Sequence, residues 1–226
     1  SFADYLDFLV NEAQEDEWVE LINVVSTNVT AFFREPHHFE ELLKAVDQWV
    51  RAGQKRLRIW SAASSSGQEP YTLAIVIRRA LNLAGHNEVD AKILATDIST
   101  KMLSICKVGQ YPTEAIKPIP VEERNRYFKL DRSTGMQQVS PDLRRMITFA
   151  RLNLTEAPYA MKGPMDAIFC RNVMIYFDNH VRSKIIDQVL RLLKPGGLFM
   201  IGHAESIQGP QLKQFTRIGA SMYRRK

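Results

Sequence analysis

Cysteine is scarce in this sequence, with only two among 226 residues. Cys106 and Cys170 lie far apart and form no C-x-x-C spacing, so we expect neither a disulfide framework nor a cysteine zinc site. We interpret both as small core residues of a protein in the reducing cytoplasm. Long apolar runs are lacking as well, since none approaches the roughly 18 residues of a membrane span. These absences, with an apolar fraction of 45%, favour a globular protein of one large domain, or one domain with an appendage.

Basic residues are rare in the first quarter of the chain. Residues 1–53 contain 3 basic and 11 acidic side chains, whereas the remaining residues contain 27 basic and 14 acidic ones, a net charge of +13. A basic body suits an acidic partner, either nucleic acid or a protein rich in carboxylates. A solvated basic surface without a partner explains the same charge, so composition alone leaves the partner open.

The spacing of apolar residues changes near residue 56. Before this point, helical spacing predicts amphipathic helices at residues 2–10, 18–25 and 36–53. After it, strands predicted at 56–60, 91–97, 165–170 and 197–202 alternate with helices predicted at 70–84, 99–107 and 180–194. This alternation predicts an α/β fold with a doubly wound sheet and helices on both of its faces.

Residues 108–151 interrupt this alternation of strands and helices. A short helix near 121–128 and strand-like pieces at 136–140 and 146–150 predict an inserted small β-subdomain at about 108–151. The tail, residues 215–226, predicts one last strand at the edge of the sheet. We therefore divide the chain into a small N-terminal helical piece with a linker, residues 1–35, and a main domain, residues 36–226. The first predicted helix starts almost at residue 1, so we expect the chain to be part of a longer protein.

Glycine is lacking where a dinucleotide-binding loop needs it. In "RIWSAASSSGQEPYTLAIVI", residues 58–77, a strand, a run of tiny residues and a helix follow one another, but Gly67 stands alone among serines and alanines. A G-x-G-x-x-G loop uses its glycines to admit a pyrophosphate, so this loop argues against an NAD-dependent oxidoreductase. S-adenosylmethionine has no phosphate and needs only short side chains beside the helix N-terminus. A helix that ends at Lys194, a turn at 195–197 and a buried strand are also common in methyltransferases that use this cofactor.

Polar residues follow two of the predicted strands, at the edge where an α/β sheet binds its ligands. Asp97 ends the strand at 91–97, and an ionised carboxylate can accept both hydroxyls of a ribose. Asp97 equally suits the N-terminus of the helix that starts near Ser99. Arg171 and Asn172 follow the strand at 165–170 with hydrogen-bonding groups.

Five segments occur in order along the chain: "STNVTAFFREPHHFEEL" (26–42), "WSAASSSGQEPYTLA" (60–74), "LATDIS" (94–99), "ARLNL" (150–154) and "CRNVMIYFD" (170–178). Together they resemble the chemotaxis receptor methyltransferases, the CheR family, from about residue 5 to 223. The resemblance implies a methyltransferase fold and the transfer of a methyl group from S-adenosylmethionine to glutamate side chains on the cytoplasmic part of chemoreceptors. The products are methyl esters and S-adenosylhomocysteine. We expect a cytoplasmic monomer, whose insertion matches the small β-subdomain at which some family members, but not all, bind a receptor tail peptide.

The resemblance also implies a set of cofactor contacts at matching positions of this sequence. These are Asn28, Thr30, Arg34, Glu69, Asp97, Asn153, Leu154, Arg171 and Asn172. Asp97 is expected to hold the ribose, while Asn153 and Leu154 border the adenine. A guanidinium holds a carboxylate with two parallel hydrogen bonds, which suits Arg34 to the amino-acid end of the cofactor and makes it a candidate catalytic residue.

Other interpretations stay open for several residues. Asn28 and Thr30 also suit a turn or cap before the next helix. Tyr176 is predicted to bring a catalytic hydroxyl near the acceptor carboxylate, or else to pack within the apolar run "VMIYF". The five histidines are expected to form no ligand set, because the adjacent His37 and His38 at a helix start point in different directions, and no metal is predicted.

Two features depart from the family pattern. Gln68 stands where the family commonly has an acidic residue, which leaves Glu69 as the only carboxylate of the loop. The family also carries a basic helix near its N-terminus that engages the acidic receptor, whereas the N-terminal piece of this chain is acidic. We therefore expect that the basic helix lies outside this sequence.

Two further functions compete with receptor methylation. A nucleic-acid methyltransferase suits the basic body, but "RNVMIY" stands where enzymes that methylate base amino groups carry N/D-P-P-Y/F. The sequence also lacks a Lys/Arg stripe interleaved with aromatics, so no nucleic acid is expected. A non-catalytic module that senses the cofactor stays open, because binding and catalytic residues largely coincide.

Overall fold

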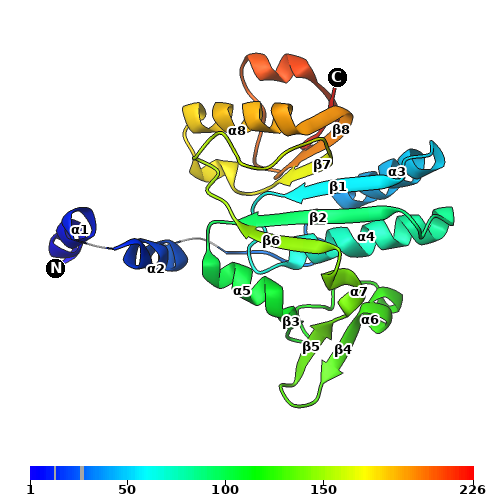
Figure 1. Cartoon of the computed structure of the whole chain (residues 1–226), viewed down its shortest axis with the longest axis horizontal. Coiled ribbons are helices and arrows are strands. Elements are labelled where there is room, and N and C mark those ends of the chain that lie inside the picture. Colours follow the sequence, from blue (N-terminus) through cyan, green and yellow to red (C-terminus); the bar gives the residue numbers. More distant parts are fainter. Residues whose placement is uncertain (13, 26–27) are drawn as a thin grey trace.

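The computed structural model describes residues 1–12, 14–25 and 28–226 of the chain (Figure 1). Residues 26 and 27, which begin the first family-like segment, lie outside the described residues. The chain starts with helices α1 (Phe2–Asn11), α2 (Glu15–Val25) and α3 (His37–Arg51), which confirms the three helices predicted there. Among the helices that the structure describes, none combines the length and the apolar character that a membrane span requires.

The main domain is built on a seven-stranded sheet with the strand order β6-β2-β1-β7-β8-β10-β9. The strands are β1 (Arg56–Ser61), β2 (Asp90–Asp97), β6 (Ile147–Arg151), β7 (Met165–Cys170), β8 (Leu193–Ile201), β9 (Phe215–Gly219) and β10 (Met222–Arg225). The first five strands in this order run parallel, and β10 pairs antiparallel with both β8 and β9. The order reverses direction at β1 and β7, so the carboxyl ends of these strands form the switch point at which doubly wound sheets bind ligands. The predicted α/β fold is confirmed.

Alternating side chains divide the core between the two faces of the sheet. Ile59 and Trp60 are neighbours in β1, yet Ile59 packs in a cluster with α3 and α4 (Gln68–Ala84), while Trp60 packs in a second cluster with α8 (Asn179–Leu192). The period of two in strand side chains explains this division. Cys106 and Cys170 are free and buried, as predicted. Figure 1 shows α1 and α2 beyond the carboxyl ends of the strands, on the same side as the switch point.

Two predictions for the C-terminal part need correction. Helix α8 ends at Leu192 and not at Lys194, because β8 begins directly at Leu193. The segment 195–197, predicted as a turn, lies within an excursion of β8: Met165 pairs with Leu193, and Ala167 pairs next with Leu198. The tail forms two strands, β9 and β10, rather than one.

A second sheet of three strands lies beside the main one, in the order β3-β5-β4. It contains β3 (Gln110–Tyr111), β4 (Phe128–Asp131) and β5 (Met136–Val139), with helices α6 (Val121–Tyr127) and α7 (Pro141–Arg144), and it follows α5 (Thr100–Val108). The strand-like piece at 146–150 is β6, which pairs with β2 at the edge of the main sheet. The predicted insertion of 108–151 therefore includes one strand of the main sheet, because apolar alternation cannot tell which sheet a strand joins.

Candidate cofactor site

A cavity of about 520 Å³ lies at the carboxyl ends of β1, β2 and β7. Every residue predicted as a site residue lines it: Asn28, Thr30, Arg34, Glu69, Asp97, Asn153, Leu154, Arg171, Asn172 and Tyr176. Ile22 and Val25 of α2 complete the wall, so the N-terminal helical piece covers one side of the cavity. The structure brings the predicted residues to one place, and their individual contacts with a ligand stay predictions.

The small-residue loop, residues 61–67, forms the floor of the cavity with Ala62, Ala63 and Ser65. Steric constraints explain why the loop has a glycine at position 67. Gly67 has a φ of +98°, and a Cβ at this position would lie 2.6 Å from the Tyr111 hydroxyl. That hydroxyl donates a hydrogen bond of 2.8 Å to the Ser66 carbonyl. Gly67 therefore serves the contact between the loop and the small sheet, and not the approach of a phosphate.

Asp97 is the last residue of β2, and its carboxylate accepts hydrogen bonds but forms no ion pair among the described residues. Its two carboxylate oxygens accept backbone N–H groups of Ser65 at 2.8 Å and Ser99 at 2.9 Å. Burial raises the pKa of Asp97, and the backbone donors oppose this shift only in part. Among the described residues no lysine, arginine or histidine forms an ion pair with it. Ser99 is itself the N-cap of α5, so Asp97 both supports the helix start and faces the cavity, and the two interpretations of Asp97 are compatible.

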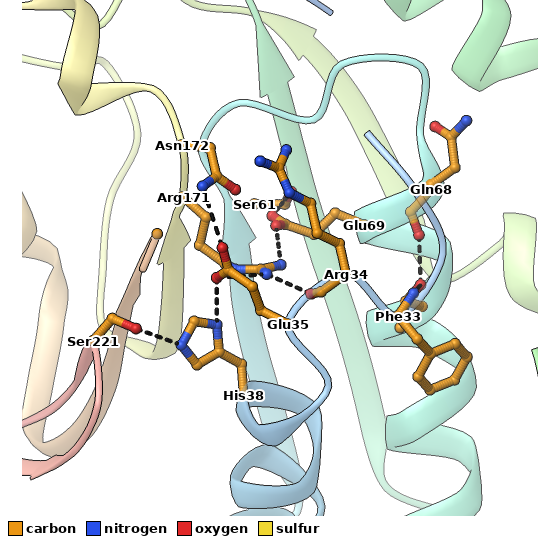
Figure 2. Close-up of polar contacts among 12 residues, drawn as sticks. Phe33, Arg34, Glu35, His38, Ser61, Gln68, Glu69, Arg171, Asn172 and Ser221 are labelled. Atoms are coloured by element: carbon orange, nitrogen blue, oxygen red, sulfur yellow. Dashed lines mark hydrogen bonds and ion pairs between the residues drawn. The ribbon is translucent and has the colours of Figure 1, made fainter. Parts of the chain in front are cut away.

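Arg171 forms the centre of a buried ion-pair network at the other end of the cavity (Figure 2). One terminal nitrogen donates to Glu69 Oε2 at 2.9 Å, and the other donates to Glu35 Oε2 at 3.0 Å and to the backbone carbonyl of Arg34. The Ser61 hydroxyl donates to the second oxygen of Glu69 at 2.7 Å. The Arg171 side chain is only 2% exposed. Two carboxylates therefore already occupy its guanidinium.

The pKa values of the two carboxylates around Arg171 shift in opposite directions. Burial alone would raise the pKa of Glu35, but the charge of Arg171 and hydrogen bonds from Arg171, Asn172 and the His203 backbone hold it below its usual value. Burial raises the pKa of Glu69, and the charge of Arg171 opposes the shift without cancelling it. Both groups lie within reach of one cation, so each carboxylate is paired with Arg171 without a ligand.

Sequence reasoning missed two residues of this framework. Glu35 adopts a φ of +57° and accepts hydrogen bonds from Asn172 Nδ2 and the His203 backbone N–H, both at 3.3 Å. Glu205 accepts the backbone N–H of Asn172 at 3.0 Å and that of Ile175 at 3.2 Å. The only signal for Glu35 was its place in the "FFREP" segment, next to Arg34. Its left-handed backbone has no signature in a residue that precedes proline.

Arg34 differs from Arg171 although both line the cavity. Its guanidinium donates to the Val29 carbonyl at 2.8 Å, a contact within the linker, residues 28–35. It forms no ion pair with any carboxylate of the described residues. In Figure 2 its side chain lies apart from the hydrogen bonds that join Arg171 to Glu35 and Glu69. Of the two arginines in the cavity wall, Arg34 is thus the one whose charge is available to an anionic group.

Among the remaining predicted residues, Leu154 is buried, whereas Tyr176 and Asn153 have more accessible side chains. Tyr176 ends the short helix η1 (Met174–Tyr176) and is 58% exposed, whereas its neighbour Met174 is buried at 2%. The exposure rules out the interpretation that Tyr176 packs in the core. Asn153 donates from Nδ2 to Glu156 and accepts the Thr155 backbone N–H, both within the loop that follows β6.

The histidines were expected to form no ligand set, but three of them lie together. The end of β8 brings His203 against both His37 and His38. One nitrogen from each of the three imidazoles lies within 4.8 Å of the others. The fold creates this cluster by joining positions more than 160 residues apart, which no local pattern reveals.

A small-residue loop, a strand-end carboxylate and a cavity at the switch point are the features expected of an α/β protein that binds S-adenosylmethionine. Residues 28–224 match the family model described as "CheR methyltransferase, SAM binding domain". The chain is 40% identical to chemotaxis protein methyltransferase 2 of Pseudomonas aeruginosa over 208 residues, which cover 91% of this chain and 72% of that protein. It is 39% identical to the chemotaxis protein methyltransferase of Escherichia coli K12 over 226 residues, which cover 98% of this chain and 76% of that protein. The chain belongs to the CheR methyltransferase family, and S-adenosylmethionine is its cofactor.

Proposed function

We propose that this protein transfers the methyl group of S-adenosylmethionine to glutamate side chains on the cytoplasmic part of chemoreceptors, forming glutamate methyl esters. Family membership and the names of the relatives, which are chemotaxis protein methyltransferases, support the reaction and its place in chemotaxis. The observation that carries the proposal is the cavity at the switch point. It joins an uncompensated carboxylate, Asp97, to an arginine without a carboxylate partner among the described residues, Arg34.

The residues present fit this cofactor. The cavity volume of about 520 Å³ falls within the roughly 300–1,000 Å³ of small-molecule sites. The ionised Asp97 would accept the ribose hydroxyls, and the short side chains of Ala62 and Ala63 leave room beside the backbone. Arg34 would hold the carboxylate of the amino-acid end. Arg171 would act indirectly, because Glu35 and Glu69 already occupy its guanidinium.

When bound, the cofactor supplies a methyl group on a positively charged sulfur, which is a good leaving group. The residues of the chain contribute alignment and exclusion of water more than proton transfer, since an acceptor glutamate with a pKa of about 4.3 is already ionised at neutral pH. Fixed orientation of two reactants is worth about 10⁵–10⁸ M in effective concentration. The exposed Tyr176 hydroxyl lies at the rim, where it would donate a hydrogen bond to the incoming carboxylate and orient it.

The acceptor side of the proposal is tested with labelled S-adenosylmethionine and a purified cytoplasmic fragment of a chemoreceptor. We expect label to enter the fragment as a base-labile ester, and not to enter a fragment whose acceptor glutamates are changed to glutamine. Tyr176→Phe should lower the rate of transfer at saturating cofactor and leave the affinity for S-adenosylhomocysteine unchanged. Arg34→Lys should weaken that affinity, because an ammonium cannot form the two parallel bonds of a guanidinium.

The same experiment separates this function from a cofactor-sensing module. A sensing module would bind S-adenosylhomocysteine in the micromolar range and transfer no label to any receptor fragment. An absence of binding would contradict both functions, and transfer to the glutamine fragment would contradict glutamate as the acceptor.

A further inference from the structure

The proposed methyl transfer leaves a cluster of three histidines without a role. His37 and His38 are the first two residues of α3, and His203 follows the end of β8. Nε2 of His37 lies 3.0 Å from Nε2 of His203, and the two rings are stacked with their centroids 4.6 Å apart. One nitrogen from each of the three residues lies within 4.8 Å of the other two. A neutral imidazole has one nitrogen lone pair, so the cluster offers three candidate ligand atoms at this spacing.

The cluster has a buried end and an open end. His38 is fully buried, His37 is half-buried and His203 is exposed. The buried ring gives the site a rigid wall, and the exposed ring gives an ion and its water ligands a path from solvent. The nitrogens of a tetrahedral zinc site lie roughly 3.4 Å apart, given Zn–N bonds of about 2.1 Å. The three nitrogens here lie within 4.8 Å of one another, so binding of an ion requires the rings of His37 and His203 to adjust to this spacing.

His38 is also oriented as metal-binding histidines are. Its Nε2 lies 3.1 Å from the Ser221 hydroxyl, and its Nδ1 lies 3.5 Å from Oε2 of Glu35 without forming a hydrogen bond. A histidine that binds a metal through one nitrogen nearly always donates the N–H of the other to a carboxylate or another acceptor. With Nδ1 bound to an ion, Nε2 of His38 has the Ser221 hydroxyl as its acceptor. A buried nitrogen without a hydrogen bond costs stability by itself, and an ion in the cluster is one way to offset this cost.

We propose that His37, His38 and His203 form a binding site for a divalent ion of the zinc class. Three imidazoles and no thiolate suit Zn²⁺, Cu²⁺, Ni²⁺ and Co²⁺ rather than Mg²⁺ or Ca²⁺, which prefer oxygen ligands. The ion fastens the start of α3 to the end of β8. The Glu35 carboxylate beside His38 supplies negative charge against the added positive charge, and it also accepts the His203 backbone N–H and an Arg171 donor. The site is therefore a structural one that supports the rim of the cofactor cavity.

The test uses the full chain without an affinity tag, treated with a chelator and then titrated with Zn²⁺ by calorimetry. We expect one ion per chain and a loss of affinity of about tenfold or more in His203→Ala, whose side chain is exposed, so the variant folds. His180→Ala is the matched control, because His180 is an exposed histidine on α8 outside the cluster, and its affinity for Zn²⁺ should equal that of the unchanged chain. Equal binding by His203→Ala, or equal losses in both variants, would overturn the site.

Spectroscopy and thermal unfolding test the geometry and the structural role. Co²⁺ in a tetrahedral nitrogen site gives intense visible absorption, which His203→Ala should abolish. An ion that binds only the folded chain raises the melting temperature, so Zn²⁺ should raise it for the unchanged protein and for His180→Ala, but not for His203→Ala. Stoichiometric binding with an unchanged melting temperature would overturn the fastening role.

Discussion

The two ends of the cofactor cavity hold their carboxylates by opposite means. At the β2 end, Asp97 accepts backbone N–H groups, including those of Ser65 and Ser99. At the β7 end, Glu35 and Glu69 share the guanidinium of Arg171. Both ends are buried, yet the carboxylate at the first has no cationic partner among the described residues, while the two at the second share a cation of the protein.

This difference distinguishes a residue that is available to a ligand, Asp97, from one that holds the protein together, Arg171. Asp97 lies in the cavity wall with its charge uncompensated, so the hydroxyls of a ligand gain strong, charge-assisted bonds there. The two terminal nitrogens of Arg171 donate to the side chains of Glu35 in the linker and Glu69 in α4 and to the Arg34 carbonyl, so Arg171 joins segments that are distant in sequence. The resemblance to the family predicted both residues as cofactor contacts, whereas their contacts in the structure indicate different roles.

Removing Arg171 breaks the ion-pair network at the β7 end and should have the largest effect. Arg171→Ala leaves two buried carboxylates without their cation, and loss of one partner from a buried ion pair typically costs about 3–5 kcal/mol. We expect the free energy of unfolding to fall by this amount, as measured by chemical denaturation followed by circular dichroism. Cofactor affinity should fall as well, because the linker that carries Arg34 loses its attachment.

The exposed ion pair between Arg51 and Asp47 on α3 provides the matched control. Arg51→Ala removes an arginine from a pair at 2.8 Å, but in solvent, where such pairs contribute little. A loss of stability in Arg171→Ala no larger than that in Arg51→Ala would contradict the framework role.

Removing Asp97 breaks the uncompensated end and should affect binding more than folding. In Asp97→Ala, the ribose loses a charged acceptor, which is worth about 1.5–3 kcal/mol, or about 10- to 150-fold in the dissociation constant. Calorimetry with S-adenosylhomocysteine measures this loss. Asp90 begins the same strand at its far end, so Asp90→Ala should leave the affinity unchanged, and equal affinities for the two variants would refute the ribose role.

The raised pKa of Asp97 predicts a pH dependence with a definite sign. Ribose hydroxyls donate to the ionised carboxylate, so bound ligand favours the ionised form and affinity is highest above the pKa of the free protein. Burial places that pKa above the usual value of 3.8. As pH falls through it, affinity for S-adenosylhomocysteine should decrease, by up to about tenfold per pH unit.

Calorimetry across the acid range should show this decrease for the unchanged protein and a flatter profile for Asp97→Ala. Glu69, whose pKa is also raised by burial, titrates in both proteins, so the difference between the profiles isolates Asp97. Profiles that run in parallel would mean that Asp97 does not titrate in contact with the ligand.

Much of the fold was predictable because its rules are local. Apolar period and turn residues located α1, α2, α3 and the strands β1, β2 and β7, and the switch point followed from their alternation. Sheet membership was not predictable. The strand β6 was assigned to the insertion because hydrogen bonding between strands depends on distant partners, and β9 and β10 were merged because the bend at Ala220 and Ser221 lacks a strong turn signal.

The residues that line the site were predicted from the sequence, but the contacts that hold them in place were not. Matching motifs brought ten residues to one cavity, yet they did not show that Arg34 keeps its charge available while Arg171 does not. That distinction depends on Glu35, whose left-handed backbone aims its carboxylate at Arg171, and on contacts between the linker and β7. The histidine cluster likewise depends on the packing of α3 against the end of β8.

The smallest effect is expected at Gln68, which departs from the family pattern without touching either end of the cavity. Gln68 lies outside the cavity lining; its side-chain oxygen accepts the Ser66 hydroxyl at 2.8 Å, and its backbone carbonyl accepts the Thr72 hydroxyl. Gln68→Glu places a charge in the first turn of α4, where the helix dipole stabilises it by about 0.3–1 kcal/mol. We expect a slightly higher melting temperature and an unchanged affinity for S-adenosylhomocysteine. An affinity change of tenfold or more would show that the cavity extends to this side of the loop when the cofactor is bound.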